Sequence, residues 1–426
     1  MSAFQDIREA IQKQKIIDTH EHLPIAAEKR GEHRDVLAAY LEHYLSSDLR
    51  SAGLSEMELA QARDANLDIK HRWEIIAPYY EACQDTGYAR AIQIAMRDLH
   101  GVEKLNGDTI EALQASYEKT YSRDYFYEVL HDRCHIEGAL LDSFDEDRFG
   151  GDARLFRRVW RPEKYINPQP VAGQVFRWIE GHYGSIESLD DWMSAFEEEL
   201  CEYCSRGINT LKIGLAYDRD LTFKEVSYRK AKEAFDKVLE NWELDGRGTR
   251  DDFQFPMVVQ DFMMRHILSS LRGRDAVIQI HTGLQEGNSN ILQHSHPMKL
   301  NNLFKEYDDV HFDLFHIGWP WWRQSLALVK MFPNVTLDMC WAHIISPPSA
   351  MACLVKAVQT VPANKILGFG GDYMFVDGVY GHLEMAKDNI ARALALLVDE
   401  KKISSDRAIR IAQMILYDNP KRVFNL

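Results

Sequence analysis

Several histidines and one aspartate of this sequence have the types and the spacing of a metal site. His20 and His22 form a His-x-His pair in Asp-Thr-His-Glu-His, and 17 histidines occur among the 426 residues. The other candidates are His281, His316 and Asp372. Neutral imidazole nitrogens and carboxylate oxygens suit Zn²⁺, Mn²⁺ or Fe²⁺, and a catalytic site needs about three or four protein ligands with one position open for water. We therefore expect a divalent metal, zinc before manganese or iron, with one or two ions per chain.

Each of these residues comes at the end of a short apolar run that predicts a β-strand. Alternate residues of a strand face the same side, so a strand at Lys15–Asp18 that continues into His20 and His22 would point both imidazoles the same way. The other predicted strands are Ile136–Leu141, Arg154–Val159, Thr210–Leu215, Ala276–Ile280, Val310–Phe315, Val335–Met339 and Ile366–Phe369.

Amphipathic stretches between the later strands predict helices. Strands that alternate with helices in this way indicate parallel strands joined by right-handed crossovers, and eight such units predict an α/β fold, a closed (β/α)₈ TIM barrel. In such a barrel the active-site residues lie at the C-terminal ends of the strands. The predicted helices are Leu189–Cys204, Lys224–Trp242, Phe262–Leu271, Pro297–Lys305, Trp322–Met331, Ser349–Val361 and Gly381–Asp399.

Residues 24–130 are predicted to be a helical insertion after the first strand. The chain must return to complete the cylinder, so we expect one barrel over residues 1–426 rather than two domains. Ser55 and Glu58 have the spacing of a capping box, and Gly246–Asp252 is the most loop-like stretch of the barrel half. The predicted helices of the insertion are Asp35–Leu45, Ser55–Asn66 and Arg72–Leu99.

The composition excludes several classes of partner. The sequence has 65 acidic residues against 50 lysines and arginines, and its net charge of −15 repels nucleic acid and anionic lipid. No apolar run approaches the roughly 18–20 residues of a membrane-spanning helix, and the N-terminus lacks an apolar segment typical of a signal peptide. We expect a cytoplasmic protein with a small-molecule substrate, no nucleic-acid or membrane partner, and a homo-oligomeric state.

The set of strand-end residues resembles the amidohydrolase superfamily, closest to its amidohydrolase-related branch (amidohydrolase 2). The residues that carry this resemblance are His20 and His22 on strand one, Lys212 in Leu-Lys-Ile-Gly on strand four, His281 and His316 on strands five and six, and Asp372 on strand eight. The C-terminal segment 415–424 also resembles the closing helix of that branch. The likeness covers about 16–23 and 134–426.

The resemblance implies a role for each residue. His20, His22, His281 and Asp372 would hold the principal metal, and His316 would bind a second metal or polarise a substrate carbonyl. Two alternative roles are open to Lys212. In two-metal members a strand-four lysine is carboxylated and bridges the ions, whereas in one-metal members an unmodified lysine would meet a substrate carboxylate.

Residues on the loops after strands four and six are candidates for binding the substrate. Arg219 could grip a carboxylate with two hydrogen bonds, or it could form an ordinary ion pair. Tyr217 lies on the same loop, and Trp319 belongs to a tryptophan-rich run that could form an apolar wall or cover the next helix. Asp313 and Asp338 could fix the tautomer of a histidine ligand.

Two enzymatic functions fit this site. In the first, a hydrolase, a water activated by the metal attacks an amide, lactone or ester carbonyl of a small acidic substrate, and Asp372 moves the proton. In the alternative, a non-oxidative decarboxylase or a uronate-type isomerase, the metal orients the substrate and Asp372 moves a proton without adding water. A barrel that only binds a ligand is a third reading.

Overall fold

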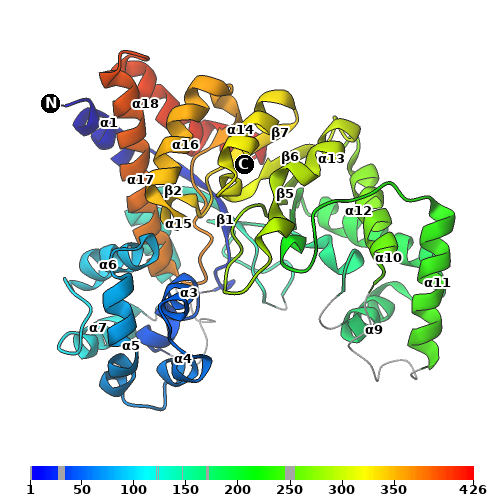
Figure 1. The fold of residues 1–426 in the computed structure, drawn as a ribbon, viewed down its shortest axis with the longest axis horizontal. Coiled ribbons are helices and arrows are strands. Elements are labelled where there is room, and N and C mark those ends of the chain that lie inside the picture. Colours follow the sequence, from blue (N-terminus) through cyan, green and yellow to red (C-terminus); the bar gives the residue numbers. More distant parts are fainter. Residues whose placement is uncertain are drawn as a thin grey trace.

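A computed structural model describes residues 2–26, 34–120, 122, 124–145, 147–168, 172–244 and 255–426 (Figure 1). The predicted loop Gly246–Asp252 lies outside these residues. Parallel strands form two sheets, in the orders β1-β2-β3 and β4-β5-β6-β7-β8. The strands are β1 (Ile16–Glu21), β2 (Ile136–Leu141), β3 (Phe156–Arg158), β4 (Thr210–Ile213), β5 (Val277–Ile280), β6 (His311–Leu314), β7 (Val335–Asp338) and β8 (Ile366–Leu367).

Backbone hydrogen bonds join the two sheets into a closed barrel. Between β3 and β4, Trp160 N donates to Thr210 O at 3.0 Å and Lys212 N donates to Trp160 O at 2.9 Å. Between β8 and β1, Thr19 N donates to Phe369 O at 3.1 Å. The protein is therefore a (β/α)₈ TIM barrel, as the alternation of strands and helices predicted.

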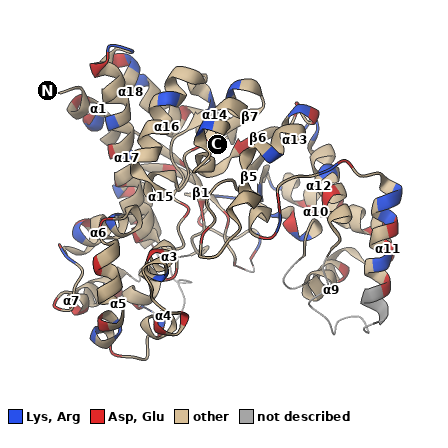
Figure 2. Cartoon of the chain, viewed as in Figure 1, with Lys and Arg blue, Asp and Glu red and all other residues tan. Residues whose placement is uncertain are grey.

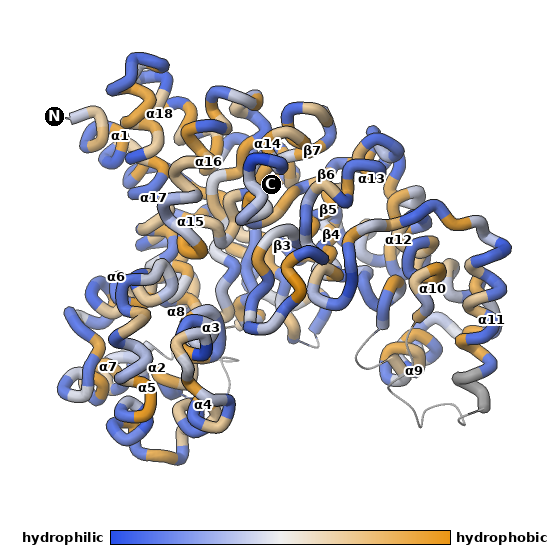
Figure 3. The backbone as a smooth tube through the Cα atoms, in the orientation of Figure 1, coloured by the Kyte–Doolittle hydropathy of each residue, from blue (hydrophilic) through white to orange (hydrophobic). Residues whose placement is uncertain are grey.

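The strands are buried along their length, as expected when helices cover a parallel sheet. Every residue of β1, β4, β5 and β7 is buried. Strand β1 extends to Glu21, further than predicted, so His20 lies within the strand and His22 directly after it. In Figure 3 the helices around the barrel alternate between hydrophilic and hydrophobic residues, as expected of helices with one buried face.

The later helices surround the barrel, and α1 (Ala3–Gln12) packs against α17 on the outside. Figure 2 shows acidic and basic residues interspersed along α11 rather than gathered by sign. Among the described residues, no helix is both long and apolar enough to cross a membrane. The helices are α9 (Ala172–Tyr183), α10 (Leu189–Ser205), α11 (Tyr228–Leu244), α12 (Met257–Leu271), α13 (Asn301–Glu306), α14 (Trp322–Met331), α15 (Ala342–Ile345), α16 (Pro347–Thr360), α17 (Val376–Asp399), α18 (Ser405–Gln413) and α19 (Asn419–Val423).

The segment between β1 and β2 folds into helices at one side of the barrel (Figure 1). The predicted helix Arg72–Leu99 is two helices, because Thr86 accepts a hydrogen bond from Ala89 N and starts a new one. Gly87 permits a close approach to the barrel, since a Cβ there would lie 2.0 Å from Ile344 O. The helices are α2 (Val36–Tyr40), α3 (Tyr44–Ser51), α4 (Glu56–Arg63), α5 (Ile69–Cys83), α6 (Gly87–His100), α7 (Ile110–Tyr117) and α8 (Tyr125–Tyr127).

Candidate metal centre at the barrel mouth

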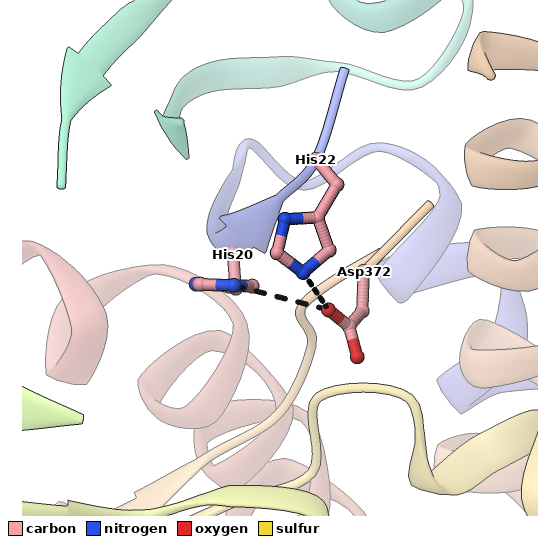
Figure 4. Close-up of side chains that lie close together, drawn as sticks. All are labelled: His20, His22 and Asp372. Atoms are coloured by element: carbon pink, nitrogen blue, oxygen red, sulfur yellow. Dashed lines mark ion pairs between the residues drawn. The ribbon is translucent and has the colours of Figure 1, made fainter. Parts of the chain in front are cut away.

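His20, His22 and Asp372 meet at the C-terminal end of the barrel. One potential ligand atom from each lies within 4.8 Å of the others. His22 Nε2 is 3.2 Å and His20 Nε2 is 3.8 Å from Oδ1 of Asp372. Figure 4 shows both imidazoles beside this carboxylate. A backbone hydrogen bond from Asp372 N to His20 O, at 2.8 Å, fixes the loop after β8 against β1.

Hydrogen bonds at the outer nitrogens set how these two imidazoles face the site. His20 Nδ1 lies 3.1 Å from Oε1 of Gln279, and His22 Nδ1 lies 2.8 Å from the backbone oxygen of Asp142. Both partners are carbonyl oxygens, so each Nδ1 carries the proton and donates it. Each Nε2 is thereby turned toward the carboxylate of Asp372, and hydrogen bonds of this kind at the outer nitrogen orient an imidazole to bind a metal through Nε2 when that atom carries no proton.

The state of these groups fits a divalent cation. His20 Nε2 is buried and faces two carboxylate oxygens, Oδ2 of Asp142 at 3.3 Å and Oδ1 of Asp372 at 3.8 Å. Burial lowers the pKa of His20 to about 3, which keeps the imidazole neutral. Burial works to raise the pKa of Asp372, but the neighbouring imidazoles of His22 and His316 hold this pKa well below its ordinary value. Two imidazole nitrogens and one carboxylate are a ligand set typical of zinc, manganese or iron.

A second group of potential ligands shares Asp372. His316, Cys340 and Asp372 are buried and each offers one atom within 4.8 Å of the others. Oδ2 of Asp372 lies 3.8 Å from His316 Nε2, so the two carboxylate oxygens face different groups. Within the described residues His281 belongs to neither group: its Nδ1 lies 3.0 Å from His316 Nε2, and its Nε2 donates to Leu284 O at 2.9 Å. His281 therefore adjoins the second group through His316, and its predicted role as a metal ligand stays a prediction.

The backbone is strained where β6, β7 and β8 enter the site. His316, Trp341 and Asp372 have φ values of 60°, 61° and 56°, in the left-handed region that non-glycine residues seldom adopt. Such strain is kept where the surrounding structure enforces it, and it clusters at functional sites. Its position at three strand ends supports this end of the barrel as the functional one.

Two cationic side chains, the buried Lys212 and the partly exposed Arg161, lie near the candidate ligands. The ammonium of Lys212 is 3.6 Å from the centroid of the Phe315 ring, and burial lowers the pKa of this lysine. Arg161, which follows β3, donates from Nε to both oxygens of Asp142, at 2.8 and 2.7 Å. Oδ2 of Asp142 in turn lies 3.3 Å from His20 Nε2. Sequence reasoning missed Asp142 and Arg161, although both follow a predicted strand and the strand-end criterion would have found them.

The three residues predicted to bind the substrate make different contacts in the structure. Arg219 is buried and its guanidinium pairs with Asp261 at 2.7 Å, so its expected role as a carboxylate grip gives way to an internal ion pair. The Tyr217 ring is 4.8 Å from that of His281, which places it at the site. The backbone oxygen of Trp319 accepts a hydrogen bond from Leu284 N at 2.8 Å. A different tryptophan, Trp341, has its ring 5.1 Å from His316.

The helical insertion also contributes to the site. Tyr44, the first residue of α3, donates from its hydroxyl to the backbone oxygen of Asp372 at 2.5 Å, and its ring stacks on Trp341 at 4.6 Å. His43 precedes it, buried, and burial lowers the pKa of this histidine to about 3. Helical periodicity in the sequence does not tell which face of the insertion meets the barrel, so neither residue was predicted.

Among the described residues, the hydrogen bonds of Asp313 and Asp338 go to groups other than histidine. Asp313 accepts a hydrogen bond from Thr336 Oγ1 at 2.8 Å, and Asp338 accepts one from Cys340 N at 2.7 Å. Burial raises the pKa of Asp313 to about 6. The hydrogen bonds that were expected from these aspartates to the histidine ligands are instead accepted by Gln279 and by backbone carbonyl oxygens.

A cavity of about 330 Å³ adjoins the metal ligands and is lined by residues that include His22, Glu42, Phe144 and Asp145. The Phe144 ring stacks on His22 with 4.9 Å between centroids, and the Arg161 guanidinium lies 5.0 Å from the same ring. Phe144 is 62% exposed, so it presents an apolar face where a ligand would enter.

Comparisons of sequence find one family and two related proteins. Residues 229–426 match the family described as amidohydrolase. The protein fluG of Emericella nidulans is 25% identical over 345 residues, which are 74% of this chain but only 38% of that protein. A uronate isomerase of Corynebacterium efficiens is 22% identical over 410 residues, 90% of this chain and 87% of the isomerase.

Comparisons of structure extend the likeness over the whole fold. A uronate isomerase from Thermotoga maritima has a TM-score of 0.80 at 16% identity, covering 100% of this chain and 98% of its own. A glucuronate isomerase from Caulobacter crescentus has a TM-score of 0.77 at 17% identity, covering 99% and 94%. A putative metal-dependent hydrolase from Lactobacillus casei has a TM-score of 0.68 at 16% identity, covering 99% and 97%. Because these matches cover nearly all of the chain, the shared fold includes the helical insertion.

Proposed function

We propose that the chain is a metal-dependent barrel of the amidohydrolase family, whose description residues 229–426 match, and that it isomerises a small acidic sugar of the uronate type between its aldose and ketose forms. The observation that carries this proposal is the position of His20, His22 and Asp372 near two cations, the buried Lys212 and the partly exposed Arg161. The likeness to two uronate-type isomerases over almost the full chain supports it.

His20, His22 and Asp372 would hold the divalent ion. When bound there, such an ion supplies Lewis acidity that polarises a carbonyl or lowers the pKa of a hydroxyl group. The chain prepares the ligands through Gln279 and the Asp142 carbonyl, which keep both Nε2 lone pairs directed inward. Fixing the ligands before binding lowers the entropic cost of assembling the site.

Lys212 would bind the carboxylate of the substrate, and Arg161, which is itself paired with Asp142 and Glu163, would add positive charge nearby. Lys212 is buried, and burial disfavours its ammonium form, so an anionic partner would stabilise it. Arg161 is held in place by Asp142 through its Nε and Nη2 atoms, with Nη2 at 2.6 Å from Oδ2. In this proposal Lys212 stays unmodified, as in the one-metal alternative.

Asp372 and its neighbours would move the proton. Aldose–ketose isomerisation takes a proton from the carbon beside the carbonyl and returns one to the former carbonyl carbon, while a hydroxyl proton passes between the two oxygens. Oδ2 of Asp372 faces His316 rather than His20 and His22, so this oxygen is available to accept and return a proton. No water is consumed in the net reaction.

Hydrolysis is the second candidate, favoured by the family description of residues 229–426 and by the Lactobacillus casei protein. The same residues would then activate water and pass its proton to a leaving group. Incubation of the metal-loaded protein in ¹⁸O-water separates the two reactions, with uronates in one series and their lactones and amides in the other. We expect uronates to give ketose products of the same elemental composition. These products should carry no more ¹⁸O than an enzyme-free control takes up by exchange. Label in a newly formed carboxylate would instead establish hydrolysis.

A further inference from the structure

The loop after β8 holds Asp372 in the left-handed region, with φ of 56°, and buried side chains of β1 bind the peptide groups beside it. Gly371 N donates to Oδ1 of Asp18, and Tyr373 N donates to Oε2 of Glu21, each at 3.1 Å. Both carboxyl groups are fully buried. Gly371 allows this close approach, because a Cβ there would overlap the Glu21 carboxyl group. The donors on both sides of Asp372 are therefore fixed against the first strand.

The carbonyl oxygen of Gly371 is held from the other direction, by α17. His382 lies in this helix, fully buried, and its Nδ1 is 3.0 Å from Gly371 O. Because a carbonyl oxygen can only accept, Nδ1 carries the proton and donates it. This oxygen belongs to the peptide group between Gly371 and Asp372, so a rotation of that group would change φ of Asp372. The hydrogen bond from His382 therefore restrains the strained dihedral angle.

The imidazole of His382 has no other described polar contact. The centroid of its ring lies 5.0 Å from that of Phe369 and 6.2 Å from that of Tyr373, two residues of the same loop. Within the part of the chain that the structure describes, its Nε2 is buried without a hydrogen-bond partner. Burial lowers the pKa of His382 to about 3, so the ring stays neutral. A buried polar side chain whose one hydrogen bond goes to this peptide group is placed to orient it.

We propose that His382 is a positioning residue, which holds the peptide group between Gly371 and Asp372 so that the Asp372 carboxylate points to His20 and His22. The left-handed conformation is unfavourable for aspartate and persists only where its surroundings enforce it. Without the hydrogen bond from His382, the peptide group would rotate and the carboxylate would turn from the imidazoles. The inference rests on the proposed role of Asp372 as a metal ligand, but not on which reaction the barrel catalyses.

Hydrogen exchange of the metal-free protein tests the restraint itself, resolved to single amides by electron-transfer fragmentation. His382→Phe keeps a ring and removes the donor. His343→Phe is a matched control, because His343 is also fully buried and donates to Gly368 O of the same loop at 2.9 Å, further from Asp372. We expect the amides of Gly371 and Asp372 to lose protection in His382→Phe and to keep it in His343→Phe. Equal protection of these amides in the two variants would overturn the role of His382.

Cobalt binding tests the consequence for the metal ligands. Competition with a chelator gives the affinity for Co²⁺, and the visible absorption bands report the arrangement of the ligands. We expect His382→Phe to bind about 10–100-fold more weakly than the wild type, with altered bands. His382→Asn keeps a donor at the position of Nδ1, so it should restore both, and His343→Phe should behave as the wild type.

Three results of the cobalt experiment would overturn the inference: unchanged binding and bands in His382→Phe, the same loss in His343→Phe, or no recovery in a folded His382→Asn. Wild-type protein that binds no cobalt would overturn it together with the metal site on which it rests. None of these measurements uses a substrate, so failure of the proposed isomerase reaction would be seen separately, as metal-loaded protein that leaves uronates unchanged.

Discussion

Oδ1 of Asp372 lies 3.2 Å from Nε2 of His22, which joins the last strand of the barrel to the first at the point where a metal would bind. The left-handed backbone of Asp372, with φ of 56°, turns its carboxylate toward the imidazoles. Both features depend on closure of the barrel between β8 and β1. The site is therefore a product of the complete fold and not of any one segment.

Asp372→Asn should abolish activity while the fold persists. The amide keeps the size of the side chain, and asparagine tolerates the left-handed region, but it is a poor metal ligand and no proton acceptor. We expect kcat/KM to fall at least 10²–10⁴-fold, the range of general acid–base catalysis. Steady-state kinetics and bound metal would be measured beside circular dichroism. Normal turnover by this variant would show that Asp372 has neither role.

Gln279→Met should weaken metal binding through His20. The substitution removes the acceptor 3.1 Å from His20 Nδ1 and lets the ring adopt the other tautomer. Loss of such a partner typically lowers metal affinity 10–100-fold. Competition with a chromophoric chelator would measure the change, with Gln359→Met on the exposed face of α16 as the control. Equal affinities in the two variants would contradict the orienting role of Gln279.

Tyr40→Phe should destabilise the contact between the insertion and the barrel. The Tyr40 hydroxyl donates to the buried carboxylate of Asp377 at 2.9 Å, and hydrogen bonds to charged groups contribute about 1.5–3 kcal/mol. Tyr228→Phe removes a similar hydrogen bond to Asp190, but at an exposed position, so little change is expected. Urea unfolding of both variants would test this. Equal stabilities would mean that the hydrogen bond from Tyr40 to Asp377 adds nothing to the fold.

The free energy of unfolding should fall between about pH 6.5 and pH 4. Burial lowers the pKa of His343 from 6.5 to about 4, so in this window the unfolded chain binds a proton that the folded chain does not. Because the pKa of this histidine is lower in the folded chain, the free energy of unfolding is greater above pH 6.5 than below it. It decreases as the pH falls through this window, by up to about 1.4 kcal/mol per pH unit for one group. His311, whose pKa burial also lowers to about 4, adds in the same direction.

Unfolding free energies at pH 7, 5.5 and 4.5 would be compared between the wild type and His343→Gln. The amide of glutamine can still donate to the Gly368 oxygen that accepts the His343 Nε2 proton at 2.9 Å, but it does not titrate. The variant should lose less stability on acidification than the wild type. Identical slopes would rule out His343 as a source of the pH dependence.

The sequence predicted the barrel because each parallel strand is a short apolar run that ends in a polar residue. His20, His22, His316 and Asp372 were found in this way, since the fold brings strand ends together whatever their separation along the chain. Asp142 carries the same signal directly after the second strand, although the predicted site did not include it.

Contacts between separate loops could not be predicted in this way. The charge on Arg219 is neutralised by Asp261 from another element, and nothing in the local sequence distinguishes that partner from a substrate carboxylate. Tyr44 belongs to the insertion and donates a hydrogen bond to Asp372. The helical period of the insertion predicts which face is buried, but it does not predict which element that face contacts. These relationships come from packing between distant segments.

The central claim, metal-dependent isomerisation of an acidic sugar, is tested most directly by the carbon NMR spectrum of a uronate incubated with the protein. Zinc-loaded protein would be compared with the same protein stripped by a chelator and then reloaded. We predict conversion of aldose signals to ketose signals by the loaded and reloaded samples and none by the stripped sample. Loaded protein that leaves the uronates tested unchanged but hydrolyses their lactones or amides would contradict the claim.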